Sequence, residues 1–208
     1  IYKFSLSANI RFGQKYISLP NRKINLYETK YPALNIRYTK GFGASLSKYN
    51  YDLVQMQLNQ DLKLGNKGTF SYNLKAGKFL NTDQLSFTDY KHFNGNQTHV
   101  NLDLNYINNF NLLPYYDLST DNQYAELHAQ HHFNGYLLRK IPLLNKLQFQ
   151  LVLGAKALLT PENKPYTEYS VGLDNVGFGK WRVLRIDYVR SNYGGVKNDG
   201  LLFRLSLF

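Results

Sequence analysis

The sequence predicts an all-β fold: a transmembrane antiparallel up-and-down β-barrel with about ten strands in this chain, which could be part of a larger barrel. Apolar and polar residues alternate with a period of two along most of the chain. No apolar run reaches the roughly 18 residues that a membrane helix needs. Aromatic residues make up 15% of the 208 residues, with 18 Tyr and 13 Phe against 1 Trp. These features indicate strands with one face toward lipid and the other toward a hydrated interior.

The first predicted strand covers residues 2–12. Its even positions are apolar, from Tyr2 through Leu6 to Phe12, whereas its odd positions, such as Lys3 and Arg11, are polar. Because successive side chains of a strand point to opposite faces, one face of this strand is apolar and the other is polar.

The same alternation recurs nine more times. The remaining predicted strands are centred on 34–39, 54–64, 70–76, 99–106, 125–133, 147–154, 168–173, 184–189 and 201–207. A tilted membrane strand needs about 9–11 residues, whereas strands of soluble proteins are nearer 5–6. Faces rich in Gln, Asn, Lys, Asp and Glu cannot form a dry sandwich core, but they can line a wet lumen. A soluble lipocalin-like barrel with the two faces inverted is the alternative.

The connections can be assigned to two sides of a membrane. Both chain ends of bacterial barrels usually lie in the periplasm. Counting back from Phe208 then places the extracellular connections at 191–199, 160–165, 108–122, 65–67 and 13–32. The same count places the periplasmic connections at 177–180, 134–146, 81–97 and 43–50. The two long ones, 81–97 and 134–146, both contain His-Phe-Asn-Gly, in which Asn-Gly favours a turn.

Three stretches carry a family resemblance. They are GQKYI at 13–17, DYKHFNGNQT at 89–98, and HHFNG at 131–135 leading into KIPLL at 140–144. From about Phe12 onward the chain resembles the C-terminal part of an uncharacterised Bacteroidota outer-membrane family, in which a carboxypeptidase-regulatory-like domain precedes a β-barrel. The resemblance implies one barrel domain over 1–208, the C-terminal portion of a longer architecture, in the bacterial outer membrane. It brings no catalytic residues with it.

Polar residues of two neighbouring predicted strands form a candidate lumen cluster. Its members are His99, Asp103, Glu126, His128 and His132. Imidazoles and carboxylates could converge on a metal, but His128 and His132 on one strand lie about 13 Å apart, too far to share one. The sequence therefore predicts a hydrogen-bonded polar network, with no metal and no cofactor.

The inward face also carries charges of both signs. The basic members are Lys3, Arg11, Arg37, Lys63, Lys75, Lys156, Arg185 and Arg204, and the acidic members are Asp61, Asp103, Glu126, Glu168 and Asp187. In a narrow barrel such side chains can pair and fill the bore, which we favour, or they can form a path for anions.

The connection 134–146 carries apolar residues at helical spacing between basic ones. They are Leu137, Leu138, Ile141 and Leu144. They form a candidate docking or mouth-closing segment, which could be buried by the barrel's own mouth, by the inner leaflet or by a partner. We favour the mouth, with the connection 81–97 packed beside it.

The composition limits the function. The net charge is +11, but the basic residues are dispersed, which predicts anionic outer-membrane lipid and lipopolysaccharide as neighbours and no nucleic acid. No nucleophile elbow is present, so the sequence does not favour an enzyme. We expect a non-enzymatic scaffold or accessory subunit of an envelope assembly or transport complex, with other envelope proteins as periplasmic partners. The alternatives are a porin-like anion-preferring channel and a lipid- or peptide-modifying outer-membrane enzyme.

Overall fold

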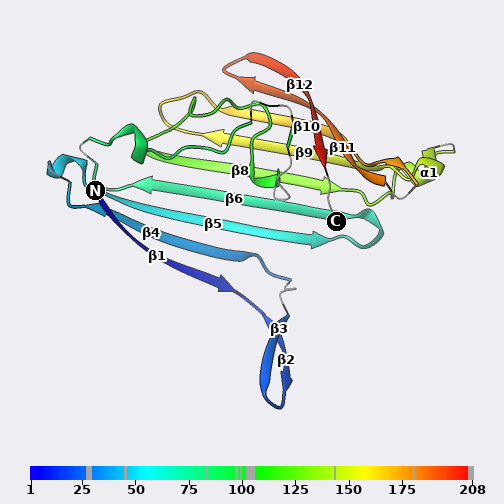
Figure 1. The fold of residues 1–208 in the computed structure, drawn as a ribbon, viewed down its shortest axis with the longest axis horizontal. Helices are drawn as coiled ribbons and strands as arrows, with labels where there is room; N and C mark the ends of the chain where they lie inside the picture. Colours follow the sequence, from blue (N-terminus) through cyan, green and yellow to red (C-terminus); the bar gives the residue numbers. More distant parts are fainter. Residues whose placement is uncertain are drawn as a thin grey trace.

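Nine strands form one continuous antiparallel sheet in the computed structural model (Figure 1). The structure describes residues 1–26, 30–44, 46–82, 84–96, 98, 100–101, 106–142, 144–179 and 181–205. In spatial order the nine strands are β1 (Tyr2–Arg11), β4 (Ala33–Phe42), β5 (Tyr51–Lys63), β6 (Thr69–Phe79), β8 (Gln123–His132), β9 (Gln150–Leu159), β10 (Tyr166–Phe178), β11 (Trp181–Tyr193) and β12 (Val196–Leu205). The predicted all-β, antiparallel meander is confirmed. Within the described residues no pairing joins β1 to β12, so the sheet is open there.

The remaining elements are short. Strands β2 (Lys15–Leu19) and β3 (Arg22–Leu26) form a separate hairpin, and β7 (Val100–Asn101) adds two parallel pairs to the edge of β12. The helical elements are η1 (Ser47–Tyr49), η2 (Gly65–Lys67), η3 (Phe87–Asp89), η4 (Tyr106–Asn108), η5 (Leu138–Lys140) and α1 (Leu144–Leu147). In the described ranges, no helix combines the length and the hydropathy that crossing a membrane requires.

The predicted strand at 99–106 is wrong as a member of the antiparallel meander. Only Val100–Asn101 is a strand there, and residues 102–105 lie outside the described residues. Strand β6 pairs directly with β8, with Lys75 opposite Glu126, so residues 80–122 form one long insertion between them. Alternation shows that a segment can form a strand, but it does not show which neighbour the segment pairs with.

This pairing also corrects the assignment of sides. We call the end of the sheet where residues 80–122 emerge the insertion end, and the opposite end the turn end. The η2 turn lies beside the end of β8, because His131 Nε2 lies 3.0 Å from the carbonyl oxygen of Lys67. Four connections therefore change ends relative to the prediction. Connections 43–50 and 81–97 lie at the insertion end, and 13–32 and 65–67 lie at the turn end.

The two ends of the meander also differ from the prediction, which placed both chain ends on one side. Tyr2 pairs with Phe42 at the insertion end, where Lys3 also forms an ion pair with Asp89 of η3 at 2.6 Å. Leu205 pairs with β11 at the turn end. A meander of nine strands starts and finishes at opposite ends of the sheet, whereas a meander of ten would start and finish at the same end. Strand β1 therefore begins at the insertion end and β12 finishes at the turn end.

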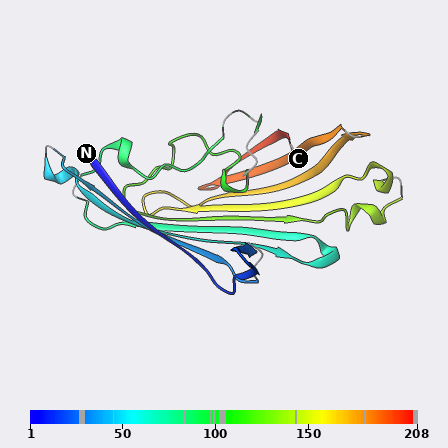
Figure 2. The same ribbon diagram turned by 60° about the horizontal axis from the view of Figure 1, so that its bottom comes forward.

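The sheet buries its polar face and exposes its apolar face. On β10, Val171 is 52% exposed, whereas Glu168 is 1% exposed. The same contrast holds from β8 to β12, with Leu153 and Leu201 exposed and Lys156 and Asp187 buried, whereas β1 is exposed on both faces. The insertion covers the polar face of the curved sheet (Figure 2). A soluble protein normally buries the opposite face.

The core lies between the insertion and this inner face of the sheet. One apolar cluster joins Phe93, Phe110, Leu113 and Leu118 of the insertion to Tyr124, Leu158 and Tyr166 of the sheet. Two smaller clusters place Leu85 against Phe79 and Leu112 against Val189. Complete burial of a side chain such as Phe110 contributes about 1.5–3 kcal/mol, so these contacts hold the insertion on the sheet.

Candidate functional site

A buried polar network lies beneath the inserted segment 106–113. It forms because antiparallel register brings inward-facing residues into rows across neighbouring strands. In one such row His128 of β8 lies opposite Lys156 of β9, which lies opposite Glu168 of β10. Each of these side chains is buried, so each needs a partner within the protein.

The carboxylate of Glu168 binds the backbone of the insertion. The amide N–H of Asn111 lies 2.8 and 2.9 Å from its two oxygens, and the amide N–H of Leu112 lies 2.8 Å from one of them. The Tyr166 hydroxyl donates to the same carboxylate at 2.7 Å. Hydrogen bonds to a charged acceptor are roughly twice as strong as neutral ones. Glu168 therefore fixes both the position and the orientation of this segment.

The side chain of Asn111 completes the attachment. Its Oδ1 accepts from Lys156 Nζ at 3.0 Å and from Arg204 Nη2 at 2.6 Å. Lys156 Nζ also donates to the carbonyl oxygen of Asn109. One residue of the insertion thus links β9, β10 and β12, whose contacting residues lie 45, 57 and 93 positions after Asn111 in the chain.

A second part of the network centres on Asp187 of β11. Arg185 approaches its carboxylate with Nε at 2.9 Å and Nη2 at 2.8 Å, and Arg204 Nε lies 3.2 Å away. Gly172 of β10 makes room for this group, because a Cβ atom there would lie 2.1 Å from Asp187 Oδ1. Two guanidinium groups around one buried carboxylate neutralise charge that would be costly to leave unpaired.

A third part contains two members of the predicted lumen cluster. Glu126 Oε2 lies 3.2 Å from His128 Nε2 and 3.4 Å from Lys75 Nζ, and Glu126 Oε1 lies 3.7 Å from Lys91 of the insertion. Burial lowers the pKa of Lys91, and the nearby carboxylate of Glu126 partly opposes that shift. The Phe110 ring covers His128, with ring centroids 4.7 Å apart.

The predicted cluster is only partly assembled. His132 pairs separately with Asp174 at 3.0 Å, near the turn end. His99 and Asp103 lie outside the described residues. Among the residues that are described, no group of three or more His, Asp or Glu side chains could hold a metal ion.

Sequence reasoning correctly placed Lys156, Arg185, Arg204, Glu168 and Asp187 on the inward face. It did not identify Asn111 as their shared partner. Asn111 lies in a connection, so no strand periodicity marks it. The stretch Asn108-Asn109-Phe110-Asn111 combines three amide side chains with an aromatic residue, and this is the only signal in the sequence that could have suggested a packed segment.

The candidate docking segment lies at the turn end and is exposed. Leu137, Ile141 and Leu144 are 37%, 45% and 36% exposed, and η5 and α1 contain no buried residue. The expectation that connection 81–97 packs beside it is wrong, because Phe93 belongs to the core cluster at the other end of the sheet. The long insertion between β6 and β8 is the physical reason, since it reverses the end at which 81–97 lies.

The comparison with protein families decides the affiliation. A model described as "Family of unknown function (DUF5686) C-terminal domain" matches residues 1–173. The chain belongs to the DUF5686 family. Membership in DUF5686 confirms the resemblance at the level of an uncharacterised family and its C-terminal domain, and the match begins before Phe12. Neither the curated proteins nor the solved structures gave a match to this DUF5686 domain.

Proposed function

We propose that this chain forms part of the wall, and the internal plug, of a non-enzymatic outer-membrane β-barrel that acts as a scaffold or accessory subunit of an envelope assembly. The inversion of the two sheet faces carries this proposal. Contiguous apolar patches on soluble monomers rarely exceed a few hundred Å². Here exposed apolar residues cover the outer face of strand after strand, including Leu6, Met56, Leu74, Leu153, Val171 and Leu201. Lipid contact accounts for such a face.

The buried face supports the same proposal. A soluble lipocalin-like barrel would point its apolar side chains inward around a ligand. This chain instead points Glu126, Lys156, Glu168, Arg185 and Asp187 inward and covers them with its own insertion. Closure into a barrel would require the edge of β1, and the edge of β12 beyond its short pairing with β7, to pair with one another or with further strands.

The plug favours a scaffold over a porin-like channel. Segment 106–113 occupies the inner face through hydrogen bonds to Glu168, Lys156 and Arg204, which would obstruct a path for anions along this wall.

An enzyme is supported less well. The Ser119 Oγ lies 2.7 Å from His92 Nδ1, but it also donates to the carbonyl oxygen of Tyr116 at 2.9 Å, so its proton is not directed at a base. From the same family resemblance we also propose that the protein comes from Bacteroidota and that a carboxypeptidase-regulatory-like domain precedes the barrel.

A single-cysteine scan of β10 tests the membrane proposal. The sequence has no cysteine, so each introduced one can be labelled alone with an environment-sensitive fluorophore. In vesicles containing a lipid-soluble quencher, we expect strong quenching at positions 169, 171 and 173 and weak quenching at position 170. Uniform weak quenching would show that neither face meets lipid, and the proposal would then be abandoned.

The exposed segment at the turn end supports the scaffold role specifically. Because Ile141 is exposed, Ile141→Asp should leave the melting temperature of the purified protein unchanged while removing a protein that copurifies in mild detergent. Lys146→Gln in the exposed helix α1 is the matched control and should retain that protein. Loss of thermal stability in Ile141→Asp without loss of a partner would contradict the docking role.

A further inference from the structure

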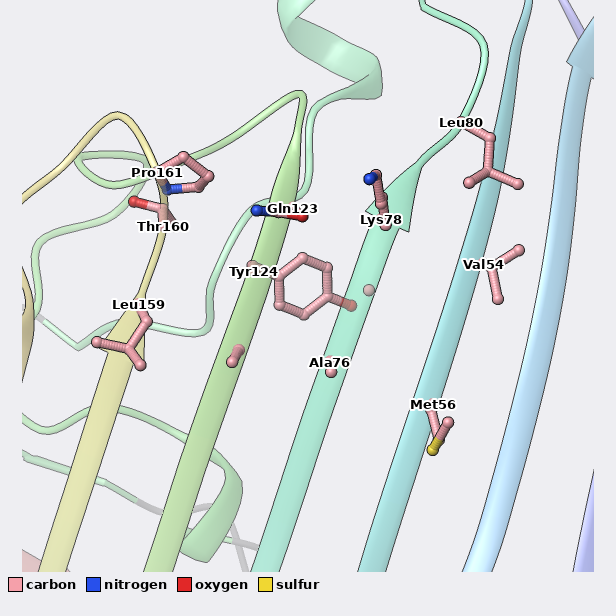
Figure 3. Close-up of a pocket in the computed structure, with 12 residues that line it drawn as sticks. Val54, Met56, Ala76, Lys78, Leu80, Gln123, Tyr124, Leu159, Thr160 and Pro161 are labelled. Atoms are coloured by element: carbon pink, nitrogen blue, oxygen red, sulfur yellow. The ribbon is translucent and has the colours of Figure 1, made fainter.

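The outer face of the sheet contains a hollow near the insertion end. Its volume is about 700 Å³, within the range of ligand pockets. Figure 3 shows that β5, β6, β8 and β9 supply its lining, from Met56 and Val54 on one side to Leu159 on the other. This surface is the one that we propose faces lipid.

Small residues in register create the hollow. Met56 lies opposite Ala76, Ala76 lies opposite Ala125, and Ala125 lies opposite Leu159. Two methyl groups therefore form the floor of a trough between two longer side chains. On the inner side of the sheet, the Tyr124 ring packs against Gly77, where a Cβ atom would lie 2.5 Å from the ring.

One end of the hollow is polar. Lys78 and Gln123 lie opposite each other at the strand ends, directly beyond the two alanines. No ion pair is recorded for Lys78 within the described part of the chain. The carboxylate on the same face of β5, Asp52, already accepts from Tyr38 at 2.5 Å and from Asn81 at 2.8 Å, and it lies 3.4 Å from Lys40 Nζ.

We propose that this hollow binds an anionic membrane lipid, with an acyl chain in the trough over Ala76 and Ala125 and the phosphate on Lys78 Nζ, where the Gln123 amide can also donate. The proposal rests on the membrane role proposed above. Such a lipid has one charged end and one apolar end, and the hollow likewise has Lys78 at one end and the apolar trough at the other. The charged end lies where the strands finish, which is the headgroup level of a tilted membrane strand.

Native mass spectrometry of the purified protein tests this proposal with phosphatidylglycerol and phosphatidylcholine of identical acyl chains. Lys78→Gln should lower retention of phosphatidylglycerol about fivefold and leave retention of phosphatidylcholine unchanged. Ala125→Leu fills the trough and should lower retention of both lipids. Lys78 is exposed, so its variant tests the site even where Ala125→Leu does not fold.

Two matched controls accompany these variants. Lys67→Gln removes an exposed charge at the other end of β6, and Ala155→Leu enlarges a residue on the same face outside the hollow. Both should retain lipid like the parent. The lipid site would be overturned if Lys78→Gln retained phosphatidylglycerol like the parent. It would also be overturned if Ala125→Leu changed the oligomeric mass rather than the bound lipid. Either result would leave the quenching at position 171 intact. Absence of that quenching would overturn the membrane role and the lipid site together.

Discussion

Replacement of Glu168 by Gln should release the plug while preserving its volume. The carboxylate receives the amide N–H groups of Asn111 and Leu112 and the Tyr166 hydroxyl. Glutamine can keep its carbonyl oxygen at the Oε1 position, which accepts from all three donors, but the negative charge is lost and the new NH₂ group faces the Asn111 N–H. A hydrogen bond to a charged group contributes about 1.5–3 kcal/mol, against about 0.5–1.5 kcal/mol for a hydrogen bond between neutral groups. Each of the three hydrogen bonds should weaken by about 1 kcal/mol, so we expect the free energy of opening segment 106–113 to fall by about 3 kcal/mol.

Hydrogen exchange measures this quantity directly. A loss of about 3 kcal/mol corresponds to exchange roughly a hundredfold faster at the amides of Asn111 and Leu112, while strand amides far from the insertion keep their protection. Asp199→Asn is the control, because Asp199 pairs with Arg190 on the exposed surface at 2.7 Å and should leave the segment protected. If Glu168→Gln exchanges like the parent, the segment is held by apolar packing and the network does not fix it.

Three further predictions concern the two faces of the sheet and the buried lysine of the insertion. Val171→Arg should cost about 2–4 kcal/mol in folding into vesicles, and Gln57→Arg on the inner face should cost much less; equal costs would refute the face assignment. Gly172→Ala should destabilise the fold by about 1–3 kcal/mol, because the new Cβ displaces the Asp187 carboxylate; an unchanged melting temperature would contradict this. Burial lowers the pKa of Lys91, so between that pKa and 10.5 the unfolded chain binds more protons and stability rises with pH. The melting temperature of the parent should therefore rise relative to Lys91→Met as pH increases through that window, and a constant difference would count against it.

The candidate site shows where sequence reasoning stops. Alternation identified Glu126, His128 and Glu168 as inward-facing because facing depends only on odd or even position in a strand. It could not identify Asn111, whose role depends on a loop folding back across three strands. Their common inward face also put His132 in one cluster with His128, whereas the structure pairs His132 with Asp174.

The sequence by itself determined the all-β class, the antiparallel meander and the division into an apolar and a polar face, because each follows from a period of two read locally. Only the tertiary structure decided that β6 pairs with β8, that residues 80–122 leave the sheet as one insertion, and that this insertion covers the charges. Strand pairing depends on which partner satisfies the backbone and buried charges of a segment far away in the chain, and local alternation carries no information about that partner.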